Sequence, residues 1–381
     1  MKKIRDSANL REFKSAWNIV ASGAKSGAFA GAVGLVSLNG KILLHKSCGF
    51  ASIYPSKVPM FKDSIFDIAS VSKAVATTTA IMMLLERKVL SLDQKVVSLL
   101  PEFADEGNEW KKLITVRHLL THTSGLPSWS DLYRRHRTRE SVLNEVLKEI
   151  DPTVKPGTTF SYSDIGFVQL GQIVELVSGK RLDSFASNEI FRPLGMVDTY
   201  YNPMVRREKR FVSTEYSNWR GEFVRGSVHD ENAYAMGGVS GHAGLFSTAV
   251  DLALFCNELI SGQSELISPD AVRLMITDHT SKLGGYVGLG WWIKSKTTPD
   301  IGPKLPPGSF GHNGYTGTSV WMDPESKLVI ILLTNRIHPV REGDPARDKS
   351  VGIMMSRKIT WSQVNRAFQD SVVKALGTQA T

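Results

Sequence analysis

The sequence is poor in cysteine, with Cys48 and Cys256 as the only two among 381 residues. They stand far apart, each inside an apolar stretch, so we predict two buried free thiols rather than a disulfide. No cysteine or histidine spacing typical of a metal site surrounds them. Disulfide-stapled scaffolds and cysteine-ligated metal proteins are therefore excluded.

Long hydrophobic runs are missing as well. No apolar stretch is long enough to cross a bilayer, so we expect no membrane span. The basic start, Met1-Lys2-Lys3, is not followed by the apolar segment of a secretory signal. We therefore expect a cytoplasmic protein.

Internal repeats and low-complexity segments are absent too, and the composition of 42% hydrophobic and 22% charged residues is that of a packed globular protein. The formal charge is +9, with the densest basic runs at residues 134–139 and 206–210. We interpret these runs as solvated loop or helix faces, with steering of an anionic substrate as the alternative. No nucleic-acid-binding signature accompanies them, so we expect no nucleic acid partner.

Strand patterns lie near both ends of the chain and helix patterns lie between them. Helices are expected at residues 10–27, 70–87, 115–120, 167–177, 248–260 and 351–376, and strands at 32–38, 41–51, 287–293, 318–322 and 328–334. Asn39-Gly40 predicts a tight hairpin between the first two strands.

This order predicts an α+β fold: an antiparallel sheet flanked by helices, with an inserted all-helical domain. Residues 1–69 and 250–381 would form the sheet domain, and residues 70–249 the mainly helical domain.

The first chemical signal is Ser-x-x-Lys at residues 70–73, at the start of a predicted helix. Residues three apart share a helix face, so the Lys73 amine can reach the Ser70 hydroxyl. A serine becomes nucleophilic when a neighbouring base takes its proton, and a lysine with a lowered pKa can do so. A capping serine and a surface lysine would give the same motif, but the apolar residues at 68–69 and 74–76 indicate a buried helix.

Two further segments carry polar groups suited to the same reaction. Tyr162, in Tyr162-Ser163-Asp164, could pass a proton to a leaving group. His312 and Gly314 precede a predicted strand, where the glycine lets a substrate backbone approach closely and the N–H of Tyr315 could be an oxyanion donor. A core tyrosine and a glycine-rich turn with an exposed histidine are the structural alternatives.

Together these segments resemble the group of class C β-lactamases, penicillin-binding proteins and family VIII esterases, over about residues 25–350. The three motifs of that family map onto Ser70 and Lys73, onto Tyr162 and Asp164, and onto His312 and Gly314. The resemblance also rests on the phrase Ile114-Thr115-Val116-Arg117-His118-Leu119-Leu120-Thr121-His122-Thr123-Ser124-Gly125-Leu126-Pro127, on Lys155-Pro156-Gly157 and on Pro193-Leu194-Gly195-Met196. It implies Ser70 as nucleophile, with the Ser70 and Tyr315 N–H groups as oxyanion donors.

Two residues depart from the family pattern. Asp164 stands where asparagine is usual, and a carboxylate there could keep Lys73 charged and shift the role of base toward Tyr162. His312 stands where β-lactamases have lysine, and a neutral histidine binds a β-lactam carboxylate less firmly. Whether Lys73 or Tyr162 is the base stays open here.

A further segment resembles the branch of muramyl-peptide amidases and related esterases. It comprises residues 228–232 and the glycine-rich residues 237–246. This resemblance implies a pocket wall bearing His229 or His242, with a loop held by capping side chains as the alternative. A metal site of His229, Asp230 and His242 fits no standard spacing, so we expect no metal.

The resemblance implies an acyl-enzyme reaction on an ester or amide, as in a carboxylesterase or an amidase of peptidoglycan fragments. A β-lactamase or D-alanyl-D-alanine carboxypeptidase is one alternative. A penicillin- or muropeptide-binding protein without turnover is another. The expected partner is a small-molecule ester, amide or peptidoglycan-derived substrate. No cofactor is required, and the sequence does not indicate an oligomeric state.

Overall fold

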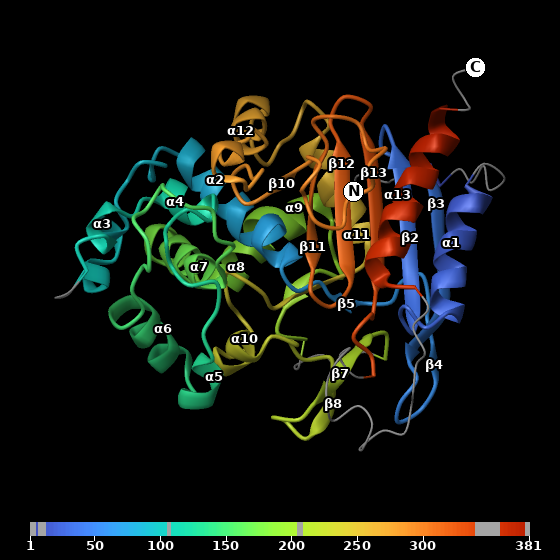
Figure 1. Cartoon of the computed structure of the whole chain (residues 1–381), viewed down its shortest axis with the longest axis horizontal. Coiled ribbons are helices and arrows are strands. Elements are labelled where there is room, and N and C mark those ends of the chain that lie inside the picture. The colour runs from blue at the N-terminus through green and yellow to red at the C-terminus, as the bar shows by residue number, and fades with distance from the viewer. Residues whose placement is uncertain (1–4, 7–12, 105–107, 204–208, 340–358, 378–381) are drawn as a thin grey trace.

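The structure, a computed structural model, describes residues 5–6, 13–104, 108–203, 209–339 and 359–377 (Figure 1). Its largest feature is an eight-stranded sheet in the order β1-β3-β2-β13-β12-β11-β10, with β4 paired to β3. The strands are β1 (Arg5–Asp6), β2 (Gly31–Leu38), β3 (Lys41–Ser52), β4 (Val58–Pro59), β10 (Trp292–Ile293), β11 (Phe310–Gly314), β12 (Thr318–Asp323) and β13 (Leu328–Thr334). Strands from both ends of the chain therefore share one sheet, as the sequence predicts.

The centre of the sheet is antiparallel and apolar on both faces. Ile331 of β13 lies opposite Leu35 of β2 on one side and Val320 of β12 on the other. All seven residues of β13 are buried, which explains the unbroken apolar run in the sequence. The hairpin between β2 and β3 turns at Asn39-Gly40, where both residues have positive φ, of 50° and 73°.

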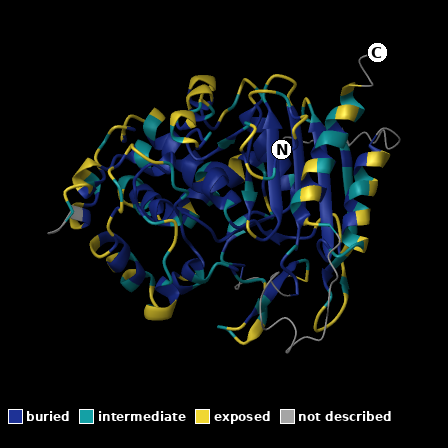
Figure 2. Ribbon diagram, in the orientation of Figure 1, coloured by how far each residue is buried: buried dark blue, intermediate teal, exposed yellow. Residues whose placement is uncertain are grey.

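Helices cover both faces of this sheet (Figure 1). The terminal helices α1 (Lys14–Lys25) and α13 (Trp361–Gly377) pack together on one face, with Val20, Phe368 and the sheet residue Ile330 in one apolar cluster. On the other face α11 (Ala249–Leu259) packs against β2 and β13. Figure 2 shows the sheet as a buried layer between these helices.

The middle of the chain is mainly helical and also carries two small sheets. One sheet has the order β5-β9-β6 and the other pairs β7 with β8. The helices are η1 (Lys73–Thr78), α2 (Thr79–Glu86), α3 (Val96–Leu99), η2 (Pro101–Ala104), η3 (Lys111–Leu113), α4 (Val116–Leu120), α5 (Leu132–Arg135), α6 (Arg139–Lys148), α7 (Asp164–Ser178), α8 (Leu182–Ala186), η4 (Ser187–Phe191), α9 (Arg192–Leu194), α10 (Glu231–Ala235), α12 (Pro269–Met275) and η6 (Ser281–Leu283). The strands are β5 (Phe66–Asp67), β6 (Tyr200–Tyr201), β7 (Ser213–Ser217), β8 (Glu222–Arg225) and β9 (Leu245–Ser247). The domain boundaries at 69/70 and 249/250 stay a prediction.

Several predicted elements have different bounds in the structure, and the last helix begins only at Trp361. The strand expected at 287–293 is reduced to β10, because the N–H groups of Leu289 and Gly290 donate to the carbonyls of Met275 and Leu120 instead of a neighbouring strand. The helix expected at 167–177 begins earlier, at Asp164, because the Ser163 hydroxyl caps it by accepting the Gly166 N–H at 3.1 Å. Residues 351–358 of the predicted last helix lie outside the described residues.

Both cysteines are free, as predicted. Cys256 is buried, but Cys48 is only half-buried, so the prediction of two buried thiols is wrong for Cys48. Over the described ranges, every helix is too short or too polar to traverse a bilayer. The cytoplasmic location stays a prediction.

Candidate active site

Ser70 follows the short strand β5, at the entrance to the helical stretch that contains η1. The Lys73 amine donates a hydrogen bond to the Ser70 hydroxyl, with 3.0 Å between Nζ and Oγ. The Lys73 side chain is fully buried, so this is not a surface lysine with a capping serine. The two residues lie as the Ser-x-x-Lys motif predicts.

Three groups from two distant segments surround the Lys73 amine. Its Nζ lies 2.7 Å from Asp164 Oδ1 and donates to the backbone carbonyl of His242 at 2.9 Å. The ring centroid of Tyr162 lies 5.1 Å from the same nitrogen. Burial lowers the pKa of Lys73, but the charge of Asp164 and the contact with Tyr162 outweigh it, so the pKa is raised. Lys73 is therefore a cation at neutral pH.

Tyr162 interacts with both Ser70 and Lys73, and these two interactions favour its ionised form. Burial raises its pKa above the ordinary tyrosine value, although the Lys73 cation opposes this. Its ring packs against that of His122, with 4.4 Å between centroids. The Nδ1 atom of His122 accepts the Ser163 N–H at 3.0 Å, and burial holds the pKa of His122 well below its usual value. His122 is thus a neutral packing residue that supports Tyr162.

Asp67 is a residue of this site that the sequence did not indicate. One of its carboxylate oxygens accepts the Ala69 N–H at 2.8 Å, and the other accepts the His229 N–H at 2.6 Å. Ala69 has a φ of +46°, a conformation that costs energy for any residue except glycine. The buried Asp67 therefore holds the backbone bend that presents Ser70.

The facing wall of the site is strand β11, which lies between β12 and the short edge strand β10. His312 is buried and its Nδ1 lies 2.9 Å from the Asn313 carbonyl oxygen. Burial, with the nearby Lys73 charge, lowers the pKa of His312 to about 3, so its ring is neutral at neutral pH. A side chain at Gly314 would lie 2.5 Å from the Ile68 carbonyl oxygen, so only glycine lets this strand approach the Ser70 segment so closely.

The Ser70 hydroxyl, Tyr162 and β11 border a cavity of about 350 Å³. Its lining residues come from seven parts of the chain: Ser70, Tyr162, Trp292, Pro299, Asp300, His312, Asn313, Gly314, Tyr315, Arg336 and Trp361. The sequence pointed to Ser70, Tyr162, His312, Gly314 and Tyr315 but not to Arg336 or Trp361. Lys73 and Asp164 lie behind this lining.

His242 and His229 each pair with a different carboxylate. The ring of His242 lies 2.8 Å from Asp230 Oδ1 and 2.8 Å from the Ser240 hydroxyl, so its backbone carbonyl rather than its ring reaches Lys73. The ring of His229 lies 2.8 Å from Glu215 Oε1 and stacks on Tyr315, with 5.7 Å between centroids. Within the described part of the chain, no cluster of three or more His, Cys, Asp or Glu side chains could hold a metal ion.

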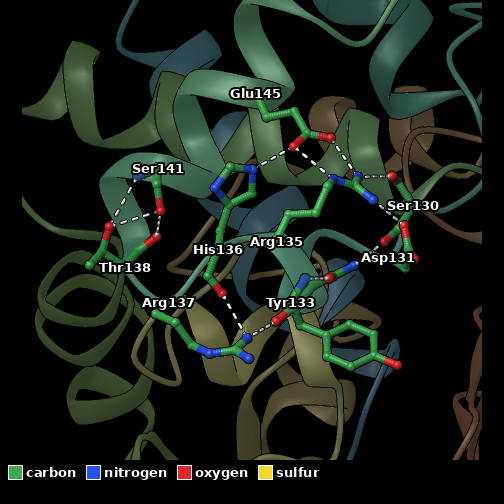
Figure 3. A network of polar contacts seen from close by, with 10 residues as sticks. Ser130, Asp131, Tyr133, Arg135, His136, Arg137, Thr138, Ser141 and Glu145 are labelled. Atoms are coloured by element: carbon green, nitrogen blue, oxygen red, sulfur yellow. Dashed lines mark hydrogen bonds and ion pairs between the residues drawn. The ribbon is translucent and has the colours of Figure 1, made fainter.

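The basic run at 134–139 is partly paired with acidic groups: Figure 3 shows Arg135 and His136 beside Glu145, whereas Arg137 contacts backbone carbonyls. Arg135 contacts Asp131 and Glu145, and Arg139 lies 2.8 Å from Glu175.

A second and larger hollow of about 730 Å³ lies beside α6 and α7, and Ser70 is not among its lining residues. The larger hollow is therefore not the candidate active site.

Comparison with known proteins agrees with this arrangement. The family described as Beta-lactamase matches residues 17–352. The chain is 34% identical to an N-acetylmuramyl-L-alanine amidase of Bacillus subtilis, over 81% of this chain and 78% of the relative. It is 31% identical to a protein of Escherichia coli with the provisional name D-alanyl-D-alanine carboxypeptidase, over 83% and 80% of the two chains. A penicillin-binding protein homologue from Caulobacter crescentus has the same fold, with a TM-score of 0.74, 18% identity and coverage of 97% and 99%.

Proposed function

Because this chain belongs to the Beta-lactamase family and is a serine hydrolase, we propose that Ser70 cleaves the amide bond of a peptidoglycan-derived N-acyl amino acid or peptide. The observation that carries the proposal is the position of the Ser70 hydroxyl, which is bonded to the buried Lys73 and lies with the half-buried Tyr162 at the edge of a cavity. The amide substrate follows the 34% identical amidase.

The first step is attack of Ser70 Oγ on the carbonyl carbon. Lys73 is already protonated beside Asp164, so the acceptor for the serine proton is Tyr162 in its phenolate form. The Lys73 cation favours that phenolate although burial opposes it. The N–H groups of Ser70 and Tyr315 would bind the oxyanion.

The second step releases the amine and then the acid. Tyr162 returns the proton to the leaving nitrogen as the carbon–nitrogen bond breaks, which leaves an ester on Ser70. A water molecule then attacks this ester, Tyr162 takes its proton, and Ser70 recovers its own proton from Tyr162.

A carboxypeptidase that removes a terminal D-alanine is the second candidate, because the Escherichia coli relative is 31% identical over four fifths of its length. The two activities differ in product. The amidase would release L-alanine from N-acetylmuramyl-L-alanine, and the carboxypeptidase would release D-alanine from an acyl-D-alanyl-D-alanine peptide.

Intact mass spectrometry with a fluorophosphonate tests the nucleophile. We expect one adduct on the wild-type protein and none on Ser70→Ala, since the reagent needs an activated serine. Ser98→Ala is the matched control, because this exposed hydroxyl only bonds the Lys95 carbonyl. An adduct of equal size on Ser70→Ala would remove Ser70 from its proposed role.

A further inference from the structure

The proposed mechanism leaves unused one group that holds the Lys73 amine, the backbone carbonyl of His242. Lys73 Nζ lies 3.0 Å from Ser70 Oγ, 2.7 Å from Asp164 Oδ1 and 2.9 Å from the His242 carbonyl oxygen. An ammonium group donates in three directions, so the place of one acceptor influences where the other protons point. The His242 carbonyl therefore helps to direct the amine toward Ser70.

The His242 carbonyl belongs to a segment whose backbone is free to adopt many conformations. Four of the eight residues at 237–244 are glycine, and three of these glycines have a positive φ. Such a backbone keeps one shape only where its surroundings hold it. Gly241 is fixed because its carbonyl accepts the Thr77 hydroxyl at 2.7 Å, and a side chain there would lie 2.0 Å from the Phe167 carbonyl oxygen. The next residue, His242, is fixed through its side chain.

Both ring nitrogens of the buried His242 have a partner. Nε2 lies 2.8 Å from Asp230 Oδ1, and Nδ1 lies 2.8 Å from the Ser240 hydroxyl. Burial raises the pKa of Asp230, but the His242 ring and the Ala233 N–H outweigh it, so its pKa lies below the usual value. A carboxylate only accepts hydrogen bonds, so Nε2 of the ring is the donor. The ring is thus held in one orientation.

Asp230 stands on a stretch of backbone that is fastened to other parts of the site. Its carboxylate also caps helix α10. The preceding residue, His229, donates its N–H to the Asp67 carboxylate at 2.6 Å, and the Asn232 amide donates to the Ser130 carbonyl at 2.8 Å. Asp230 therefore gives the His242 ring a fixed point of attachment.

We propose that Asp230 and His242 are positioning residues for Lys73: the Asp230 carboxylate holds the His242 ring, and the ring holds the His242 carbonyl against the Lys73 amine. The inference rests on the proposed function, because the place of Lys73 affects turnover only where Ser70 is the nucleophile. Neither Asp230 nor His242 is among the residues that line the cavity. Both therefore act on the proton transfers without touching the substrate.

The kinetic test uses N-acetylmuramyl-L-alanine and removes the ring while keeping the backbone carbonyl. We expect His242→Ala to lower kcat about 10- to 100-fold with little change in KM, because a displaced amine slows proton transfer but leaves the cavity intact. His242→Gln should restore part of kcat, since its side-chain amide can still donate to Asp230. His136→Ala is the matched control: it breaks a contact between a histidine and Glu145 on α6 and should leave kcat unchanged.

A double-mutant cycle tests whether the two residues act as one unit. Asp230→Ser keeps a side-chain oxygen that can cap α10 but is too short to hold the His242 ring, so it should reproduce the kcat of His242→Ala. The variant Asp230→Ser/His242→Ala should lose no more kcat than either single variant, because the same contact is already broken. Losses of kcat that multiply in the double variant would mean that the residues act separately, which would overturn the proposed pair.

A measurement on the amine itself separates this inference from the catalytic one. In ¹⁵N-lysine-labelled protein the Nζ signal of Lys73 is assigned by its loss in Lys73→Met, and we expect it to shift in His242→Ala and in Asp230→Ser but not in His136→Ala. Circular dichroism checks that each variant is folded, and Asp230→Ser decides the question where His242→Ala does not fold.

A folded His242→Ala or Asp230→Ser with an unmoved Lys73 signal, or with wild-type kcat, would overturn the positioning role. A fluorophosphonate adduct on the wild-type protein together with that result would leave Ser70 as nucleophile. A shifted Lys73 signal without any adduct on the wild type would instead support the positioning of the amine and contradict the proposed function.

Discussion

The two sides of the cavity differ in their charged side chains. On one side Ser70, Lys73, Tyr162 and Asp164 form the proposed catalytic cluster, in which the Lys73 amine lies 2.7 Å from the Asp164 carboxylate. On the other side the substrate wall consists mainly of aromatic rings and the neutral His312, and it also includes Asp300 and Arg336. The charges of the catalytic cluster face one another, whereas the substrate wall is mainly aromatic and neutral. Chemistry and specificity can therefore be changed separately.

Removing the Lys73 charge is expected to have the largest effect and would break the catalytic cluster. Lys73→Met should lower kcat on the order of 10⁴-fold, as when one member of a catalytic unit is lost, because Tyr162 loses the cation that favours its phenolate. Steady-state kinetics with N-acetylmuramyl-L-alanine measures this.

Lys111→Met is the matched control for this variant. Lys111 is also buried, at 2% exposure, and donates to the Leu147 and Lys148 carbonyls at 3.2 and 3.0 Å, away from the cavity. It should lower Tm while leaving the kcat of the folded protein unchanged. Equal losses of kcat in the two variants would mean that burial of a lysine, rather than its place beside Ser70, is what matters.

Asp67 tests whether the two sides of the cavity depend on one another. Its carboxylate holds Ala69, and its backbone carbonyl accepts the hydroxyl of Thr316 at 2.8 Å. Thr316 belongs to residues 314–317, which we call the oxyanion loop because they carry the proposed oxyanion donor Tyr315. Asp67→Asn replaces one acceptor by a donor, so either the Ala69 or the His229 N–H loses its partner. We expect kcat to fall about 10- to 100-fold through misplacement of Ser70, with little change in KM.

A second substitution distinguishes positioning from general destabilisation. Ala69→Gly should restore part of the kcat lost in Asp67→Asn, because glycine adopts a φ of +46° without strain. Rates of fluorophosphonate labelling should follow the same order. If the double variant recovers Tm but no labelling rate, Asp67 stabilises the fold without positioning Ser70.

The parts that sequence predicts well are those set by local pattern. The apolar run of β13 fixes a buried strand, Asn39-Gly40 fixes the first hairpin, and the spacing of Ser70 and Lys73 places them on one helix face. Tyr162, Asp164 and His312 came from family resemblance, since nothing in their local sequence brings them to Ser70. The structure brings them together through long-range packing.

The parts that sequence missed depend on contacts between remote segments or on backbone atoms. The bond between His229 N–H and Asp67 spans 162 residues, and Arg336 enters the cavity because β13 ends beside the oxyanion loop. His242 contacts Lys73 through its carbonyl oxygen, a group that any residue carries. Its residue type therefore said nothing about that contact.

The smallest expected effect is a shift in the pH dependence of kcat. It comes from a substitution in the catalytic cluster that leaves the substrate wall unchanged. The negative charge of Asp164 raises the pKa of both Lys73 and Tyr162. Because the proposed base is the Tyr162 phenolate, kcat should rise with pH through the pKa of the Lys73–Tyr162 pair. Asp164→Asn removes the charge, lowers that pKa, and should move the rising limb of the profile toward neutral pH.

The dissociation constant of N-acetylmuramyl-L-alanine in a Ser70→Ala background should change little with Asp164→Asn, since Asp164 is not among the residues that line the cavity. Asp93→Asn, at an exposed residue paired with Arg117, is the control and should leave the limb in place. A limb that stays fixed in Asp164→Asn, or moves to higher pH, would show that the base does not respond to the Asp164 charge. The role of proton acceptor would then have to be reassigned away from the Lys73–Tyr162 pair.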